Sequence, residues 1–207
     1  FALPYYKEKY DLNSSKRKVG INVSSLLWDG GHNSKLKVNY REYCRQIIKK
    51  YSEDDKTEIH IIPHVIDENH LVEIISKLKR PYVRYTRADE KNVLKADCLL
   101  IDCYGLLSSI YRYGEIAYIG GGFGVGIHNT LEAAVYGIPV IFGPRYQKFM
   151  EAMQLLEAKG AYSIKDYEEL KTLLDKMFSD EVFLRETGAN AGYYVTSNAV
   201  ATDRILH

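Results

Sequence analysis

Short apolar runs alternate with stretches of helical spacing along most of this 207-residue chain. Apolar runs of about four to eight residues between turns are typical of buried strands, and apolar positions three or four apart are typical of helices. The pattern predicts strands over residues 18–24, 57–62, 81–85, 97–102, 115–119, 138–142 and 161–164. It predicts helices over 39–51, 67–79, 105–113, 147–158 and 167–178, one from near Asn129, and two more from near Asp180 and Asn198.

This alternation with short turns indicates an α/β fold with a mainly parallel, Rossmann-like sheet and helices on both faces. We expect residues 18–207 to form a single domain. Residues 1–17, which are polar and lysine-rich after the first four, are interpreted as a linker or a surface arm.

The segment after the strand predicted at 115–119 carries the most specific signal, because five of the seven residues 120–126 are glycine. Glycine lets the backbone turn sharply and come close to a ligand. The next helix opens with His128, Asn129 and Glu132, and a helix start offers unpaired N–H groups to an anion. Glu132 is placed to accept two hydroxyl hydrogen bonds, as from a ribose diol. The pattern therefore predicts a nucleotide or nucleotide-sugar site.

A plainer interpretation is that glycine serves only to pack a strand-to-helix turn, which is the better explanation for one glycine but not for the whole run. Two common phosphate motifs do not fit this segment. No G-x-G-x-x-G register can be placed on residues 120–126, and the chain has no G-K-[ST] sequence.

Composition excludes several classes of function. The chain has 28 Lys and Arg against 27 Asp and Glu, so no net field attracts nucleic acid or an anionic membrane. Its three cysteines, Cys44, Cys98 and Cys103, are expected to be reduced core residues of a cytoplasmic protein. No apolar run approaches the roughly 18 residues of a membrane span, and no signal peptide is recognised.

Several other polar residues have two interpretations. His60 and His64 are four apart, but their strand-like segment contains Pro63, so no metal site is predicted. His128 has no partner in the sequence that would orient it as a base, so no catalytic residue is assigned. Arg145 and Lys148 could meet a sugar carboxylate, but we interpret them as solvated surface charges.

A family resemblance rests on two stretches, Gly120 to Glu132 and Gly137 to Pro144. With their G-x-H-N-x-L-E and G-x-P-V-x-x-G-P patterns, they resemble the donor-binding half of the Kdo (3-deoxy-D-manno-octulosonate) transferases. These are GT-B glycosyltransferases of lipopolysaccharide synthesis that use CMP-Kdo. The likeness runs from about Pro63 through Asp102–Tyr111 to Asp203, about two thirds of the chain.

The resemblance implies that the chain is one half of a GT-B fold. It implies CMP or a CMP sugar as the partner, with no metal and no cofactor. The donor would be bound by Gly121, Gly122, Gly126, His128, Asn129 and Glu132, together with His64 and Gly105. The other half, which carries the acceptor site and the acidic base in this family, is not represented here. We therefore expect the chain to be inactive alone.

The first third resembles a second family. Lys18 to Gly31 and Ile59 to Ile66 look like the polysaccharide pyruvyl transferases. The two likenesses meet near residues 63–66. Two alternative hypotheses follow: a chimera, either a natural mosaic or an engineered α/β scaffold without activity, and a pyruvyl transferase fragment. For the latter, the sequence shows no basic cluster that would bind phosphoenolpyruvate.

Overall fold

The computed structural model describes residues 17–21, 57–63, 66–76, 78, 81–93, 95–96, 98–123 and 126–205. The chain divides into two compact units, residues 1–115 and 116–207. Each contains parallel strands with helices, which confirms the predicted α/β fold class. That residues 18–207 act as a single domain stays a prediction.

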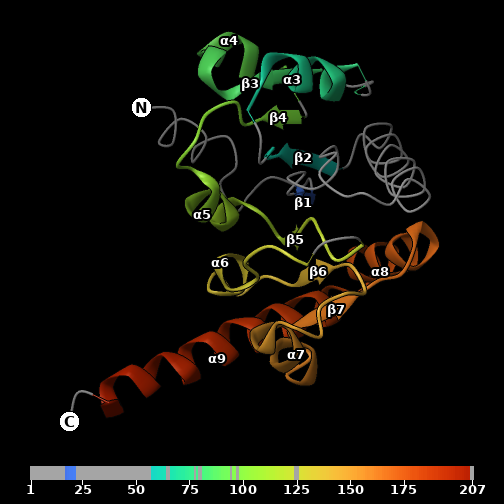
Figure 1. Ribbon diagram of the computed structural model, residues 1–207. Coiled ribbons are helices and arrows are strands. Elements are labelled where there is room, and N and C mark those ends of the chain that lie inside the picture. Colours follow the sequence, from blue (N-terminus) through green and yellow to red (C-terminus); the bar gives the residue numbers. More distant parts are fainter. Residues whose placement is uncertain are drawn as a thin grey trace. The chain divides into compact units, whose positions relative to one another are not determined.

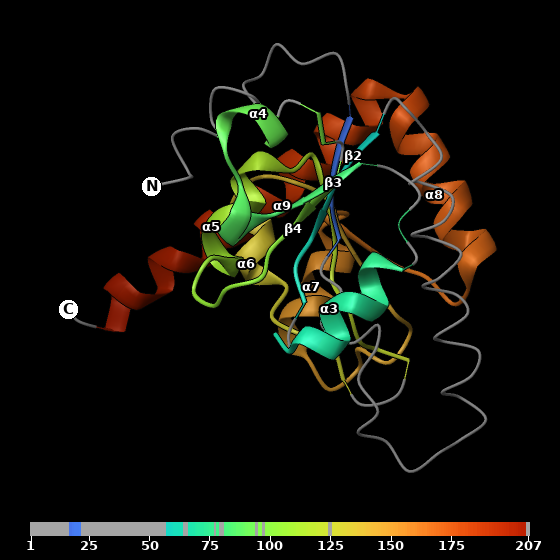
Figure 2. The ribbon, with the colours of Figure 1, turned by 90° about the horizontal axis from the view of Figure 1, so that it is seen from above.

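Unit 1 contains four parallel strands: β1 (Arg17–Ile21), β2 (Thr57–Ile61), β3 (Tyr82–Arg84) and β4 (Cys98–Leu100). Their order is β3-β4-β2-β1, and each neighbouring pair is parallel. The helices are α3 (Glu68–Ile75), α4 (Glu90–Val93) and α5 (Leu107–Ile110), the last continued by the 3-10 turn η2 (Tyr111–Tyr113). Figures 1 and 2 show α4 and α5 on one side of these strands and α3 on the other.

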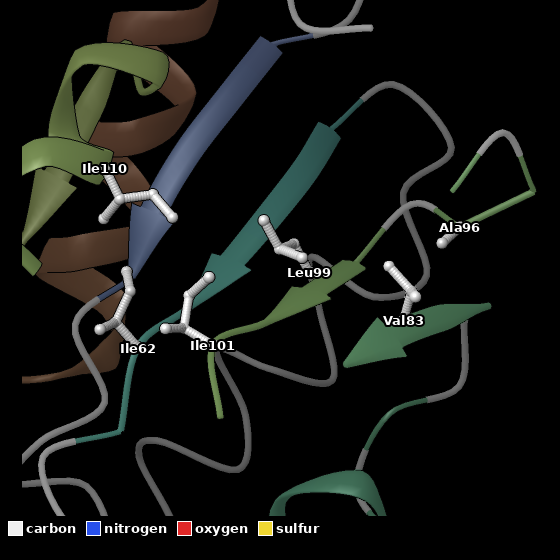
Figure 3. Close-up of a cluster of buried hydrophobic side chains, with 6 residues drawn as sticks. All are labelled: Ile62, Val83, Ala96, Leu99, Ile101 and Ile110. Carbon is white, nitrogen blue, oxygen red and sulfur yellow. The ribbon is translucent and has the colours of Figure 1, made fainter. Parts of the chain in front are cut away.

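Burial explains the strands of unit 1. All three residues of β4 are buried, as expected for a strand covered on both faces. Figure 3 shows one apolar cluster of this unit, which consists of Ile62, Val83, Ala96, Leu99, Ile101 and Ile110. Cys98 is buried and Cys103 is half-buried, and both are free thiols.

Local side chains determine where two helices of unit 1 begin. Asp67 accepts the N–H groups of Asn69 and His70 and caps the start of α3. The sequence pattern did not predict α4, although its signal is present. Asp89 Oδ1 accepts the N–H groups of Lys91 and Asn92, each at 2.8 Å.

Unit 2 contains the parallel strands β5 (Ile116–Tyr118), β6 (Val140–Phe142) and β7 (Ala161–Ser163), in that order. Its helices are α6 (Leu131–Ala134), α7 (Met150–Glu157), α8 (Tyr167–Ser179) and α9 (Glu181–Ile205). Helices α6 and α8 lie on opposite sides of the strands (Figures 1 and 2). The chain runs from β5 through the glycine-rich residues 120–126 into α6, which confirms the predicted order of strand, glycines and helix.

Two acidic side chains bond to backbone N–H groups at the start of α8. Asp166 Oδ1 accepts the Glu169 N–H at 2.9 Å. The Glu169 carboxylate reaches back to the N–H of Lys165, at 2.8 Å, and not to that of Asp166.

The prediction of two helices near the C-terminus is wrong, because α9 runs unbroken from Glu181 to Ile205. Ser197 and Asn198 suggested a new helix start. Instead, both side chains donate back to the Tyr194 carbonyl oxygen, at 3.0 and 2.7 Å, within the same helix.

Several predictions lie outside the described residues. They concern the 1–17 arm apart from Arg17, the 39–51 helix and His64.

Candidate functional site

The loop that follows β5 closes on itself. We call residues 120–128 the glycine loop. The Gly122 N–H donates to the Gly126 carbonyl at 2.9 Å, and Gly121 pairs with Ile127 in an antiparallel bridge. A longer bond of 3.5 Å joins the His128 N–H to the Gly120 carbonyl. The backbone donors of Gly122 and His128 therefore already serve the loop itself.

The glycine loop also packs directly against the turn after β6. Gly122 has φ +79°, and a Cβ there would lie 2.8 Å from the Gly143 carbonyl carbon. The Arg145 N–H donates to the Gly122 carbonyl at 2.8 Å. A Cβ on Gly126 would collide with the Phe149 ring. Close backbone packing thus accounts for these glycines, and direct contacts of Gly121, Gly122 and Gly126 with a donor stay a prediction.

Asn129 and Glu132 form a bonded pair at the start of α6. Asn129 Oδ1 accepts the Leu131 N–H at 3.0 Å, which helps to satisfy the helix start. Asn129 Nδ2 donates to Glu132 Oε1 at 3.2 Å. The amide therefore orients the carboxylate, and Glu132 is only partly buried. His128 precedes this pair and is half-buried, at the end of the glycine loop.

The helix behind the glycine loop is short. Helix α6 spans four residues and ends in a turn at Gly137, which has φ +67°. A single turn aligns few peptide dipoles, so it attracts an anion much less than a full helix does. The expectation that a helix start would bind the donor's phosphate is weakened accordingly.

Gly105 lies in the bend after β4, in unit 1. Its φ is +87°, and a Cβ there would have no neighbour within 4 Å. This glycine is therefore favoured by its backbone angle and not by crowding. Next to it, the exposed Tyr104 accepts the Ile66 N–H on its hydroxyl at 3.3 Å, which joins this bend to the segment before α3.

An ionic network that the sequence did not predict holds the same edge of unit 1. Arg84, the last residue of β3, donates from Nε to Asp102 Oδ2 at 2.8 Å and bonds both carboxylate oxygens of Glu68. Asp102 also accepts the N–H and the hydroxyl of Thr86, at 2.8 and 2.6 Å. The carboxyl end of β4 is thereby joined to the end of β3 and the first turn of α3.

The network determines the charge state of its members. Burial opposes ionisation of Asp102, but the bonds from Thr86 and Arg84 outweigh it and hold the pKa of this carboxyl below its usual value. Burial, with the nearby charge of Asp102, raises the pKa of the Cys103 thiol. Cys103 is therefore protonated near neutral pH and is a poor nucleophile. The sequence signal for this network was an Asp just beyond a buried strand. Its partners could not be read from the sequence, because Thr86 and Arg84 lie 16 and 18 residues away from Asp102.

Within the described residues, no helix is both long enough and apolar enough to cross a membrane.

No protein-family model matches the chain. By sequence, the chain is 34% identical over 185 residues to the 3-deoxy-D-manno-octulosonic acid transferase of Aquifex aeolicus, covering 83% of this chain and 51% of that protein. The enzyme of the same name from Rickettsia felis is 27% identical over 203 residues, covering 84% of this chain and 44% of the relative. The chain thus spans about half the length of these relatives.

The comparison of structures gives the same picture of the fold. The C-terminal CMP-Kdo binding domain of WaaA from Acinetobacter baumannii superposes with a TM-score of 0.67 at 17% identity, covering 91% of this chain and 93% of that domain. The C-terminal domain of LpcC, a group 1 glycosyl transferase from Francisella tularensis, gives a TM-score of 0.56 at 15% identity, covering 88% and 86%. The fold is therefore that of one half of a GT-B glycosyltransferase.

A match over 83% of the chain is longer than residues 63–207 alone, so it extends into the first third. It gives no support to a junction near residues 63–66. By its sequence and its fold, the chain belongs to the family of the 3-deoxy-D-manno-octulosonic acid transferases.

Proposed function

We propose that this chain is the part of a Kdo transferase that binds the CMP-Kdo donor. The proposal is supported by the sequence relationship and by a fold like that of a CMP-Kdo binding domain. CMP or a CMP sugar is the ligand, and no metal or cofactor is required for binding.

The observation that carries the proposal is the Asn129–Glu132 pair in unit 2. A carboxylate held by a neighbouring amide keeps its acceptor oxygens in one orientation. Two adjacent ribose hydroxyls are matching donors, and hydrogen bonds to a charged acceptor are the stronger kind. The pair follows directly on the loop beyond β5, at the carboxyl end of a parallel strand, where α/β folds bind ligands.

The remaining predicted contacts have weaker support. His128 and the three loop glycines belong to the same segment as the pair, so they are proposed as donor contacts of unit 2. Gly105 is proposed on its open surface and its place after β4. His64 is proposed from the family resemblance alone.

Transfer of Kdo by this chain alone is not expected. The chain spans about half the length of its relatives, and we propose that the acceptor site and the general base belong to the other half. Positioning of the donor without a base and an acceptor leaves the main contributions to catalysis missing.

Calorimetric or NMR titration with CMP tests the proposal, with UMP and phosphoenolpyruvate as comparison ligands. We expect CMP to bind with a Kd of about 0.1 to 10 mM, or about 3 to 5 kcal/mol. Affinity is expected to be weak because a lone half cannot enclose the donor and exclude water. Absence of CMP binding would favour the inert scaffold, and preferential binding of phosphoenolpyruvate would favour the pyruvyl transferase alternative.

A further inference from the structure

Several backbone donors in the described part of the glycine loop and at the start of α6 are already used within the protein. The N–H groups of Gly122 and His128 bond to carbonyls of the loop, and the Leu131 N–H bonds to Asn129. Helix α6 has four residues, so its dipole adds little. Free CMP carries about −1.5 to −2 charges at neutral pH, as other phosphomonoesters do, and the phosphodiester of a CMP sugar carries about one. A donor bound at this loop therefore calls for cationic side chains.

The segment after β6 brings two such side chains to the glycine loop. At its start, the Arg145 N–H bonds to the Gly122 carbonyl at 2.8 Å. At its end, the Phe149 ring lies so close to Gly126 that a Cβ there would require the ring to move. Between these two points, Gln147 Nε2 bonds to the Pro144 carbonyl at 2.9 Å and closes the turn. Residues 143–149 thus contact the glycine loop near both of their ends, through the Arg145 N–H and through the Phe149 ring.

Arg145 and Lys148 are both exposed residues of this 143–149 segment. Because the backbone of Arg145 is bonded to the loop itself, its side chain starts beside Gly122. Lys148 directly precedes Phe149, whose ring covers Gly126. The backbone thus places Arg145 at one contact point with the glycine loop and Lys148 next to the other.

Lys159 offers a basic side chain of unit 2 for comparison. Lys159 precedes β7 and is therefore at the opposite end of the parallel strands.

We propose that Arg145 and Lys148 form a cationic subsite that binds the phosphate of the donor nucleotide. The proposal rests on the proposed function, since it concerns the same CMP-bearing ligand. It reverses the interpretation of these residues as solvated surface charges. It also assigns the phosphate to side chains, where the glycine pattern had suggested backbone N–H groups.

The test compares CMP with cytidine, which lacks the phosphate, on wild type, Arg145→Gln, Lys148→Gln and the double variant. We expect each single variant to bind CMP about three- to tenfold more weakly, and the double variant more weakly still. Cytidine binding should not change. Lys159→Gln removes one positive charge at the opposite strand ends and should leave both ligands unaffected. Thermal melts check that each variant folds as wild type does.

A second measurement, the pKa of the CMP phosphate, reports on nearby charge and not on whether the variant is well folded. Nearby cations favour the phosphate dianion, so ³¹P NMR should show a lower second pKa for CMP bound to wild type than for free CMP. In the double variant at saturating CMP, that difference should shrink or vanish. If wild type binds CMP but the double variant keeps both its affinity and this pKa difference, the subsite is wrong. If wild type does not bind CMP, the proposed function fails together with the subsite.

Discussion

The Asn129 amide donates to Glu132 Oε1 at 3.2 Å, while its own oxygen accepts the Leu131 N–H at 3.0 Å. One side chain thus satisfies an N–H group at the start of α6 and orients a carboxylate three residues on. This orientation makes Glu132 the sharpest position to test.

We predict that Glu132→Ala abolishes measurable CMP binding. Loss of two charge-assisted hydrogen bonds to the ribose should cost about 2 to 4 kcal/mol, or roughly 30- to 1,000-fold in Kd. The fold should persist, since a first-turn Glu contributes only about 0.3 to 1 kcal/mol to its helix. NMR titration measures the binding, and thermal melts monitor the fold.

Glu168→Ala is the matched control for this prediction. Glu168 also lies in the first turn of a helix, α8, and is exposed. CMP shifts that are the same in Glu132→Ala, Glu168→Ala and wild type would contradict the ribose assignment.

We predict that the purified chain transfers no Kdo to a lipid A precursor. The physical reason follows from the proposed function, in which the base and the acceptor site belong to the other half of the enzyme. A radiolabel or mass-spectrometric assay with CMP-Kdo measures the product. Detectable turnover would mean that a complete catalytic site exists within these 207 residues.

We predict that Gly122→Ala destabilises the protein more than Gly105→Ala does. Both glycines have positive φ, at +79° and +87°, so either alanine incurs backbone strain of about 1 to 3 kcal/mol. Only at Gly122 would the new Cβ also meet backbone, 2.8 Å from the Gly143 carbonyl carbon. Urea unfolding measures the two free energies of unfolding, and equal losses would refute the close packing of the two turns.

We predict that Asp102→Asn lowers the free energy of unfolding at pH 7 by about 1 to 3 kcal/mol, because it weakens the bonds from Arg84 and Thr86. Glu68→Gln alters the exposed partner of the same arginine and should have a smaller effect.

The loss from Asp102→Asn should also depend on pH. The folded state lowers the pKa of Asp102 below its unfolded value of about 3.9. Its ionised form therefore stabilises the protein fully above that value, and the contribution is lost as pH falls through the lower, folded pKa. Urea unfolding from pH 7 to pH 2.5 should show the difference between wild type and Asp102→Asn narrowing below about pH 4. A difference that is constant with pH would contradict the assigned charge.

Elements defined by local patterns could be predicted from the sequence. The apolar run in β4, the Asp67 cap of α3 and the Asp166 cap of α8 all depend on residues close together in the chain. The parallel sheet followed from the alternation of such elements.

Features that depend on distant partners could not be predicted. The bond between Arg84 and Asp102 joins the ends of two strands, and no spacing rule reveals it. The contact of the glycine loop with Gly143 and Phe149 cannot be seen in the sequence either, and the role of this loop in binding a ligand stays a prediction. In α9, the local signals of Ser197 and Asn198 suggested a helix start, but the helix continues through them.

The contact between α9 and the turn after α6 limits how this protein can be altered. Gly137 is exposed in that turn, and a Cβ on Gly188 of α9 would collide with its carbonyl oxygen. Exposed turns usually tolerate inserted residues or a new chain terminus. Here the helix backbone lies directly against the turn, so a lengthened turn would displace α9 along its packed face. For loop grafting or circular permutation, the 135–137 turn is therefore to be treated as core.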